Sequence, residues 1–151
     1  MIPVDSQFKE HDPDNAEIGD CLRACIASLL ELSIDDVPHF ARDSYPDWEK
    51  TNKQLNKWLA ERELVMIDLP IRWPDDHSIE SMLSWVASCN PDVYYKLSGK
   101  SQRGFSHCVI CYNDEVVHDP TYGSPHGIVG PVDDDGTYWL SFLASGWMLK
   151  R

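Results

Sequence analysis

Two cysteines lie four residues apart in the stretch EIGDCLRACIASLLEL, and their expected surroundings differ. A thiol is a nucleophile only as its thiolate, and its pKa falls at a helix amino terminus or beside an imidazole. Cys21 follows Gly19-Asp20 at the predicted start of a helix, with Asp20 as the expected N-cap. Cys25 lies one turn later, within the apolar stripe of the same helix. We therefore take Cys21 as the candidate nucleophile and Cys25 as a core residue.

An imidazole and a carboxylate that could serve this thiol occur together much later in the chain. His107 begins the apolar stretch HCVICY, and Asp119 follows in the segment HDP. A general base activates a nucleophile, and a carboxylate holds the imidazole in one tautomer and orientation. The order Cys21, His107, Asp119 therefore predicts a catalytic triad.

The triad depends on the register of a predicted hairpin, because side chains alternate faces along a strand. A two-residue turn at Asn113-Asp114 pairs Cys108 with Asp119 and places His107 on the opposite face. A three-residue turn pairs Val109 with Asp119 and places His107 diagonally beside it. The triad therefore requires the longer turn, a bulge, or a strand that ends before Asp119.

Attack on a carbonyl also requires hydrogen-bond donors for the oxyanion. The backbone N–H of Cys21 is one candidate. The side-chain amides of Asn15, six residues before Cys21, and of Gln7, fourteen residues before it, are two more, and the sequence does not choose between them. We expect Asp20, Tyr122 and Gly123 to flank the substrate cleft.

The elements that must position these residues are predicted to be mainly helices in the first part of the chain and mainly strands in the second. Apolar periodicity predicts helices over 19–32, 47–62 and 75–89, with a short helical turn after Ser33. The segment 64–70 reads as a strand ended by Pro70, and strand-forming residues dominate 92–98, 107–123 and 136–150. Helices followed mainly by strands indicate a single α+β domain over 1–151, with the helix that carries Cys21 packed on an antiparallel sheet.

Composition narrows the classes of partner. The formal net charge of −12 disfavours general binding to nucleic acid or to anionic membranes. The amino terminus has no apolar signal region, and no apolar run is long enough to span a bilayer. Five cysteines without an export signal suggest reduced thiols, and we therefore expect a protein of the cytoplasm. We expect no cofactor and no metal. A zinc site built from Cys21, Cys25, Cys108 and Cys111 is disfavoured, because Cys108 and Cys111 would point to opposite faces of one strand.

The segments GDCLRACIASLL and HCVICYNDEVVHDPTYG together resemble the papain-like cysteine peptidase superfamily, most closely the C39-like, bacteriocin-processing-type peptidases and small phage-encoded relatives. The resemblance covers roughly 14–32 and 104–124. It implies that Cys21 is the nucleophile, His107 the general base and acid, and Asp119 the residue that orients the imidazole. The implied activity is hydrolysis of an amide, isopeptide or ester bond through an acyl-enzyme.

The resemblance implies as substrate a peptide, a protein or a small molecule containing an amide, and a location in the cytoplasm of the bacterial host if the protein is phage-encoded. Two alternatives remain open on the same fold. One is an acyl transferase of transglutaminase type that uses the same triad. The other is a catalytically inactive binding module, such as a phage protein that sequesters a host factor.

Overall fold

Three α-helices and a five-stranded antiparallel sheet make up the part of the chain that the computed structural model describes, residues 1–7, 11–15, 17–75, 77–123, 125 and 127–146. The strand order across the sheet is β1-β5-β2-β3-β4. In chain order the elements are η1 (Pro13–Asn15), α1 (Cys21–Leu30), η2 (Ile34–Asp36), α2 (Trp48–Ala60), β1 (Leu64–Arg72), α3 (Ile79–Cys89), β2 (Tyr94–Lys100), β3 (Ser106–Tyr112), β4 (Glu115–His118) and β5 (Thr137–Ser145). The α+β class expected from the sequence is confirmed. Every described helix is too short or too polar to cross a lipid bilayer.

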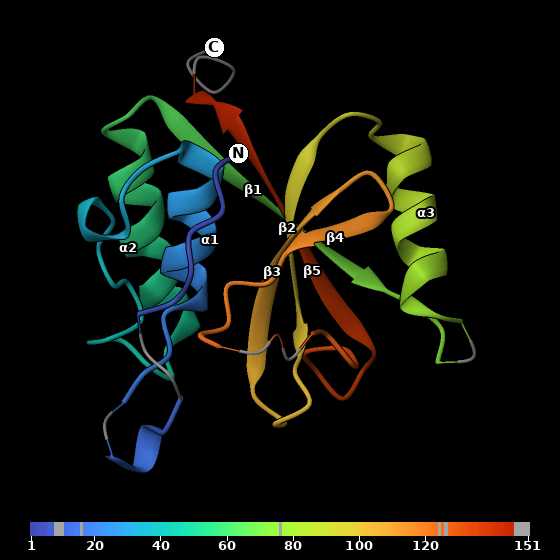
Figure 1. Ribbon diagram of the computed structural model, residues 1–151, viewed down its shortest axis with the longest axis horizontal. Coiled ribbons are helices and arrows are strands. Elements are labelled where there is room, and N and C mark those ends of the chain that lie inside the picture. The colour runs from blue at the N-terminus through green and yellow to red at the C-terminus, as the bar shows by residue number, and fades with distance from the viewer. Residues whose placement is uncertain (8–10, 16, 76, 124, 126, 147–151) are drawn as a thin grey trace.

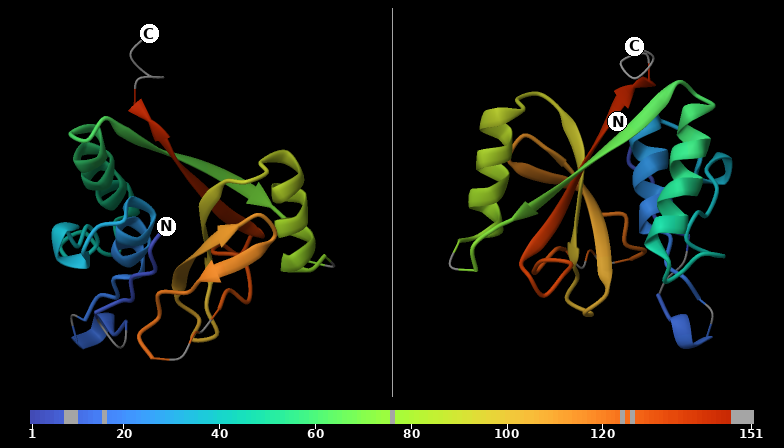
Figure 2. Two further views of the ribbon diagram at one scale, coloured as in Figure 1. Left: turned by 45° about the horizontal axis from the view of Figure 1, so that its top comes forward. Right: turned by 180° about the vertical axis from the view of Figure 1, so that it is seen from behind.

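The sheet is covered on both faces (Figure 1). Helices α1 and α2 lie on one side, whereas α3 lies on the other, as the two further views show (Figure 2). Apolar residues of α1 and α2 pack with β1, and Cys25 of α1 packs with Cys108 and Ile110 of β3. Met82, Leu83 and Val86 of α3 pack on the opposite face of the sheet. The helix that begins at Cys21 is thus fixed against the strand that carries His107.

Side-chain caps start two of the three helices, but not the one that carries the nucleophile. Asp47 accepts a hydrogen bond from the N–H of Lys50 at the start of α2, and Ser78 accepts one from Ser81 at the start of α3. Asp20 occupies the N-cap position of α1, yet its side chain makes no capping hydrogen bond. The prediction that Asp20 is the N-cap residue is therefore confirmed, but its side chain does not cap the helix, because tertiary contacts described below engage its carboxylate.

Strand β1 is longer than the sequence predicts. Pro70 does not end it, because β1 continues to Arg72 and Pro70 lies opposite Trp139 of β5. A proline lacks the N–H that a ladder needs, and it is tolerated in an edge strand. Strand β1 is an edge strand of this sheet. The position of a strand within a sheet is a tertiary property, which explains why local sequence misplaced this boundary.

Candidate active site

The β3–β4 hairpin combines a two-residue turn with a bulge. Tyr112 pairs with Glu115 and Cys111 with Val116, but Ile110 pairs with His118, so Val117 is the extra residue. Strand β4 then ends at His118, directly before Asp119. The triad required a longer turn, a bulge, or a strand that ends before Asp119. The structure has the bulge and the early strand end. His107 Nε2 lies 2.8 Å from Asp119 Oδ1.

Asp119 is held from several directions. Its Oδ1 accepts hydrogen bonds from the backbone N–H of Thr121 at 3.0 Å and from the Thr121 hydroxyl at 2.6 Å, and its Oδ2 accepts one from the N–H of Gly127 at 2.8 Å. Although burial opposes ionisation, the hydrogen bonds from His107 and Thr121 hold the pKa of Asp119 well below its usual value. The carboxylate is therefore ionised and fixed in orientation at neutral pH.

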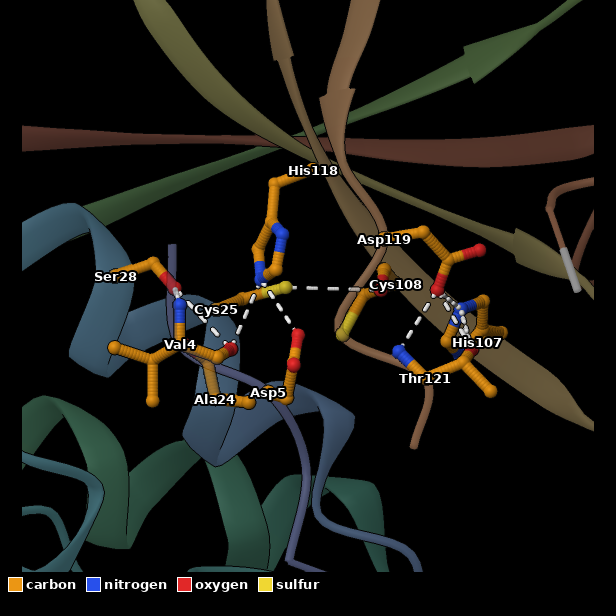
Figure 3. Close-up of polar contacts among 10 residues, drawn as sticks. All are labelled: Val4, Asp5, Ala24, Cys25, Ser28, His107, Cys108, His118, Asp119 and Thr121. Carbon is orange, nitrogen blue, oxygen red and sulfur yellow. Dashed lines mark hydrogen bonds and ion pairs between the residues drawn. The ribbon is translucent and has the colours of Figure 1, made fainter. Parts of the chain in front are cut away.

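The ring of His107 is buried between this carboxylate and the thiol. Burial opposes protonation of the ring, but hydrogen bonds with Asp119 and Cys21 outweigh it and raise the pKa of His107 to about 9. Because Nε2 faces Asp119, Nδ1 is the ring nitrogen that can exchange a proton with Cys21. Figure 3 shows His107 grouped with Asp119 and Thr121 on one side of β3.

The Cys21 thiol is partly enclosed at the first residue of α1. A hydrogen bond with the Cys108 thiol and burial raise the pKa of Cys21 well above its usual value, and the interaction with His107 only partly offsets them. This direction is opposite to the lowering expected from the helix start. Helix α1 begins at Cys21, as predicted from the sequence, but the Cys108 thiol beside Cys21 stabilises the protonated form of the Cys21 thiol.

Two cavities meet at the thiol and the imidazole. One, of about 130 Å³, is walled by the aromatic rings of Tyr45, Phe105 and Tyr122. The other, of about 330 Å³, runs between Trp48, Trp139 and the buried side chain of Lys96. Cys21 and His107 line both. An extended substrate could therefore occupy both cavities, with its reacting carbonyl at Cys21.

The structure does not bring either predicted oxyanion amide to Cys21. The Asn15 amide is exposed in η1 and donates to Asp12 at 2.7 Å. The Gln7 amide donates to Asp35 at 2.9 Å, and its oxygen accepts from Arg23. Neither residue lines the cavities beside Cys21. The sequence separation that suggested Asn15 and Gln7 does not translate into proximity, because the Asn15 amide is held by the nearby Asp12, and the Gln7 amide is held by Asp35 and Arg23.

The three predicted cleft residues have different positions. Asp20 borders the smaller cavity but is only 1% exposed, and its Oδ2 accepts from the N–H of Gln7 and lies 3.7 Å from Arg23. Its carboxylate thus joins the amino-terminal segment to α1. Tyr122 is exposed at the rim of the same cavity. Gly123 adopts a left-handed conformation with φ of 88° and lies outside both cavity linings.

The remaining histidine and cysteine predictions concern His118, Cys25, Cys108 and Cys111. His118 Nε2 lies 2.9 Å from the carbonyl oxygen of Val4 and points away from His107 (Figure 3). Cys25 is fully buried, as expected for a core residue. Cys108 and Cys111 pack in clusters on opposite faces of the sheet, as predicted from strand alternation.

Three residues of the site were not predicted from the sequence. Thr121 has a signal in hindsight, because an Asp in a turn commonly accepts a hydrogen bond from the backbone N–H two residues later. Cys108 and Lys96 carry no local signal, because their proximity to Cys21 depends on how α1 packs across β2 and β3.

Comparisons with known proteins add no relative. No protein-family model matches the chain, and comparisons with curated protein sequences and with solved structures found no match.

Proposed function

We propose that this protein is a thiol-dependent hydrolase of papain-like type, related to C39-like peptidases, that cleaves an amide, isopeptide or ester bond through an acyl-enzyme. The observation that carries the proposal is the contact of His107 with Asp119 through Nε2, on a ring that also interacts with the Cys21 thiol. The two cavities that meet at this pair provide room for substrate on both sides of the thiol.

In the proposed reaction, Cys21 Sγ as thiolate attacks the carbonyl carbon, and His107 carries the proton removed from the thiol. Asp119 stabilises the resulting imidazolium. The first N–H groups of a helix have no intrahelical partner, and the Asp20 side chain caps none of those of α1. These N–H groups are the oxyanion donors that we assign. Protonation of the leaving amine or alcohol by His107 releases it and leaves an acyl thioester on Cys21.

Hydrolysis of the thioester completes the cycle. His107 accepts a proton from water, the resulting hydroxide attacks the acyl carbon, and the acid product and the Cys21 thiol are released.

Because the pKa of His107 is about 9 and that of Cys21 is raised, the pair holds both protons at neutral pH. Loss of one proton produces the reactive form. We therefore expect acylation to accelerate toward alkaline pH.

An inactive binding module on the same fold is the second candidate. The raised pKa of Cys21 and the engagement of the Asn15 and Gln7 amides elsewhere favour it. It predicts that Cys21 forms no acyl adduct at any pH.

Acylation of Cys21 by p-nitrophenyl acetate distinguishes the two. Cys89 is exposed, so the experiment uses a Cys89→Ser background to remove a nonspecific thiol. Acid-quenched samples at pH 7 and pH 9.5 are analysed by intact mass and peptide mapping. The hydrolase proposal expects a transient acetyl group on Cys21, formed faster at pH 9.5 and absent in Cys21→Ser. Absence of any adduct on Cys21 at either pH would support the binding module.

A further inference from the structure

Lys96 is a buried cation in the larger cavity beside the candidate nucleophile. Its side chain belongs to β2 and is only 7% exposed. The cavity of about 330 Å³ that it lines is also lined by Cys21, His107 and Cys108. Lysine is almost never this buried unless it is paired, because removing a charge from water is costly.

The partner that normally offsets this cost is missing from the part of the chain that the structure describes. Lys96 Nζ donates one hydrogen bond of 2.8 Å, to the hydroxyl of Ser98. No carboxylate among the described residues forms an ion pair with it. An ammonium group has three donors, so Ser98 leaves two that a ligand in the cavity can use.

The register fixes where this charge lies. Ser98 is directly opposite Cys108 across β2 and β3, and paired residues share a face. Lys96, two residues from Ser98 on the same strand, shares that face, which is the one on which α1 packs. Lys96 therefore lies on the same face of the sheet as Cys108, a member of the buried cluster against which Cys21 packs.

Two acidic residues also border the cavity, and they limit what it can hold. Asp68 and Asp133 are both exposed, and Asp68 Oδ1 accepts a hydrogen bond from Ser141. Exposed carboxylates remain hydrated and screened, whereas the buried ammonium is not. The acids at the mouth disfavour a multiply charged anion, and the lysine inside favours a single carboxylate.

We propose that Lys96 is a specificity-determining residue that binds a carboxylate of the substrate beside the bond attacked by Cys21. This inference rests on the proposed hydrolase function. The substrate class is thus an amide, isopeptide or ester that carries a carboxylate on the side of the reacting carbonyl that enters the larger cavity. The Ser98 hydroxyl positions the ammonium group for this contact.

Iodoacetate and iodoacetamide form a matched pair of probes. Both alkylate a thiolate and they are nearly equal in size, but only iodoacetate carries a carboxylate. The ratio of their rate constants at Cys21 cancels any change in the thiolate fraction, because both reagents react with the same thiolate. The measurement uses the Cys89→Ser background at pH 9, with Cys21 followed by peptide mapping.

We expect Lys96→Met to lower the iodoacetate-to-iodoacetamide ratio by about tenfold, the scale of one charge-assisted hydrogen bond. Lys96→Arg should keep most of the preference. Lys100→Met is the matched control, because it changes the net charge by the same amount. Lys100 lies on the same strand as Lys96, but its side chain is 41% exposed. It should leave the ratio within about twofold, as expected for a screened surface charge.

A second measurement needs no variant. Succinate should slow the alkylation of wild-type Cys21 by iodoacetamide, and the neutral succinamide should not. An unchanged ratio in Lys96→Met, or equal protection by both competitors, would overturn the carboxylate site while leaving the hydrolase proposal standing. A Cys21 that reacts with neither reagent would overturn both.

Discussion

The two halves of the candidate site are organised to different degrees. On the β3–β4 hairpin, Asp119 accepts four hydrogen bonds and orients His107. At the start of α1, by contrast, Asp20 does not cap the helix, and the Cys21 thiol is stabilised in its protonated form by Cys108. The base is preorganised, whereas the nucleophile must first lose a proton. The difference indicates that reactivity is limited by the state of the thiol and not by the placement of the base.

The amino-terminal segment joins these halves. Val4 donates from its backbone N–H to Ser28 of α1, and Ser6 donates to the carbonyl of Pro120, next to Asp119. His118 contacts the Val4 carbonyl from the hairpin side. The relative position of Cys21 and His107 therefore depends on residues that perform no chemistry.

The largest expected effect comes from removing the base. His107→Ala should lower the rate of Cys21 acylation by roughly 10²–10⁴-fold, the usual contribution of a general acid–base residue. The rate is measured by mass spectrometry with p-nitrophenyl acetate. His118→Ala, on the same hairpin but facing Val4, is the matched control and should change the rate only a few-fold. Equal losses in the two variants would show that His107 acts only structurally.

Asp119→Asn is expected to reduce acylation by about 10²-fold and to lower the pKa of His107 from about 9. The hydrogen bond with Asp119 is the largest single interaction that raises this pKa, and its loss leaves burial of the ring opposed only by the interaction with Cys21. The imidazole pKa is followed by NMR titration in both proteins. A His107 pKa that stays near 9 in the variant would contradict the assignment of Asp119 as its orienting residue.

The same pair makes stability depend on pH. The folded-state pKa of His107 lies above its usual value of 6.5, so its stabilising contribution is fully present below about pH 6.5 and is lost as pH rises through about 9. The difference in pKa corresponds to about 3 kcal/mol at most. Urea unfolding at pH 6 and pH 10 should show a larger loss for wild type than for Asp119→Asn. An equal loss would mean that other groups govern the alkaline transition.

At the start of α1, by contrast, we expect one substitution to make Cys21 more reactive. Cys108→Ala should lower the pKa of Cys21, because its largest cause of elevation is the hydrogen bond with Cys108. We expect alkylation by iodoacetamide at pH 7.5 to be about tenfold faster, because a larger fraction of Cys21 is then thiolate. Cys25→Ala opens a comparable space in the same cluster and should not shift the profile. If both variants shift it equally, the cause is loosened packing.

Local sequence predicted the elements better than it predicted their contacts. Periodicity identified α1, α2 and α3, and the order Cys21, His107, Asp119 selected residues that the fold brings together. The bulge at Val117 has no marker in the stretch NDEVVH, because it forms through pairing with β3. The contacts of the Gln7 side chain with Arg23 and Asp35, and the position of Lys96 beside Cys21, likewise depend on tertiary packing, and the roles of these residues were misjudged or missed.

Thr121→Val gives the smallest and most selective test of the preorganised half. It removes the hydroxyl that donates to Asp119 Oδ1 at 2.6 Å and keeps the backbone N–H bond to the same oxygen. A single hydrogen bond contributes about 0.5–1.5 kcal/mol, so acylation should slow by roughly 2–10-fold.

The chain supplies a close control for this variant. Thr137 bonds to Asp135 through its hydroxyl at 2.6 Å and its backbone N–H at 3.2 Å, the same arrangement at the start of β5. Thr137→Val should cost similar stability in urea unfolding while leaving acylation unchanged. If both valine variants slow acylation alike, the effect of Thr121 is one of general stability. A loss confined to Thr121→Val would show that the hydroxyl acts on His107, through Asp119 or through its own 3.3 Å contact with His107 Nε2.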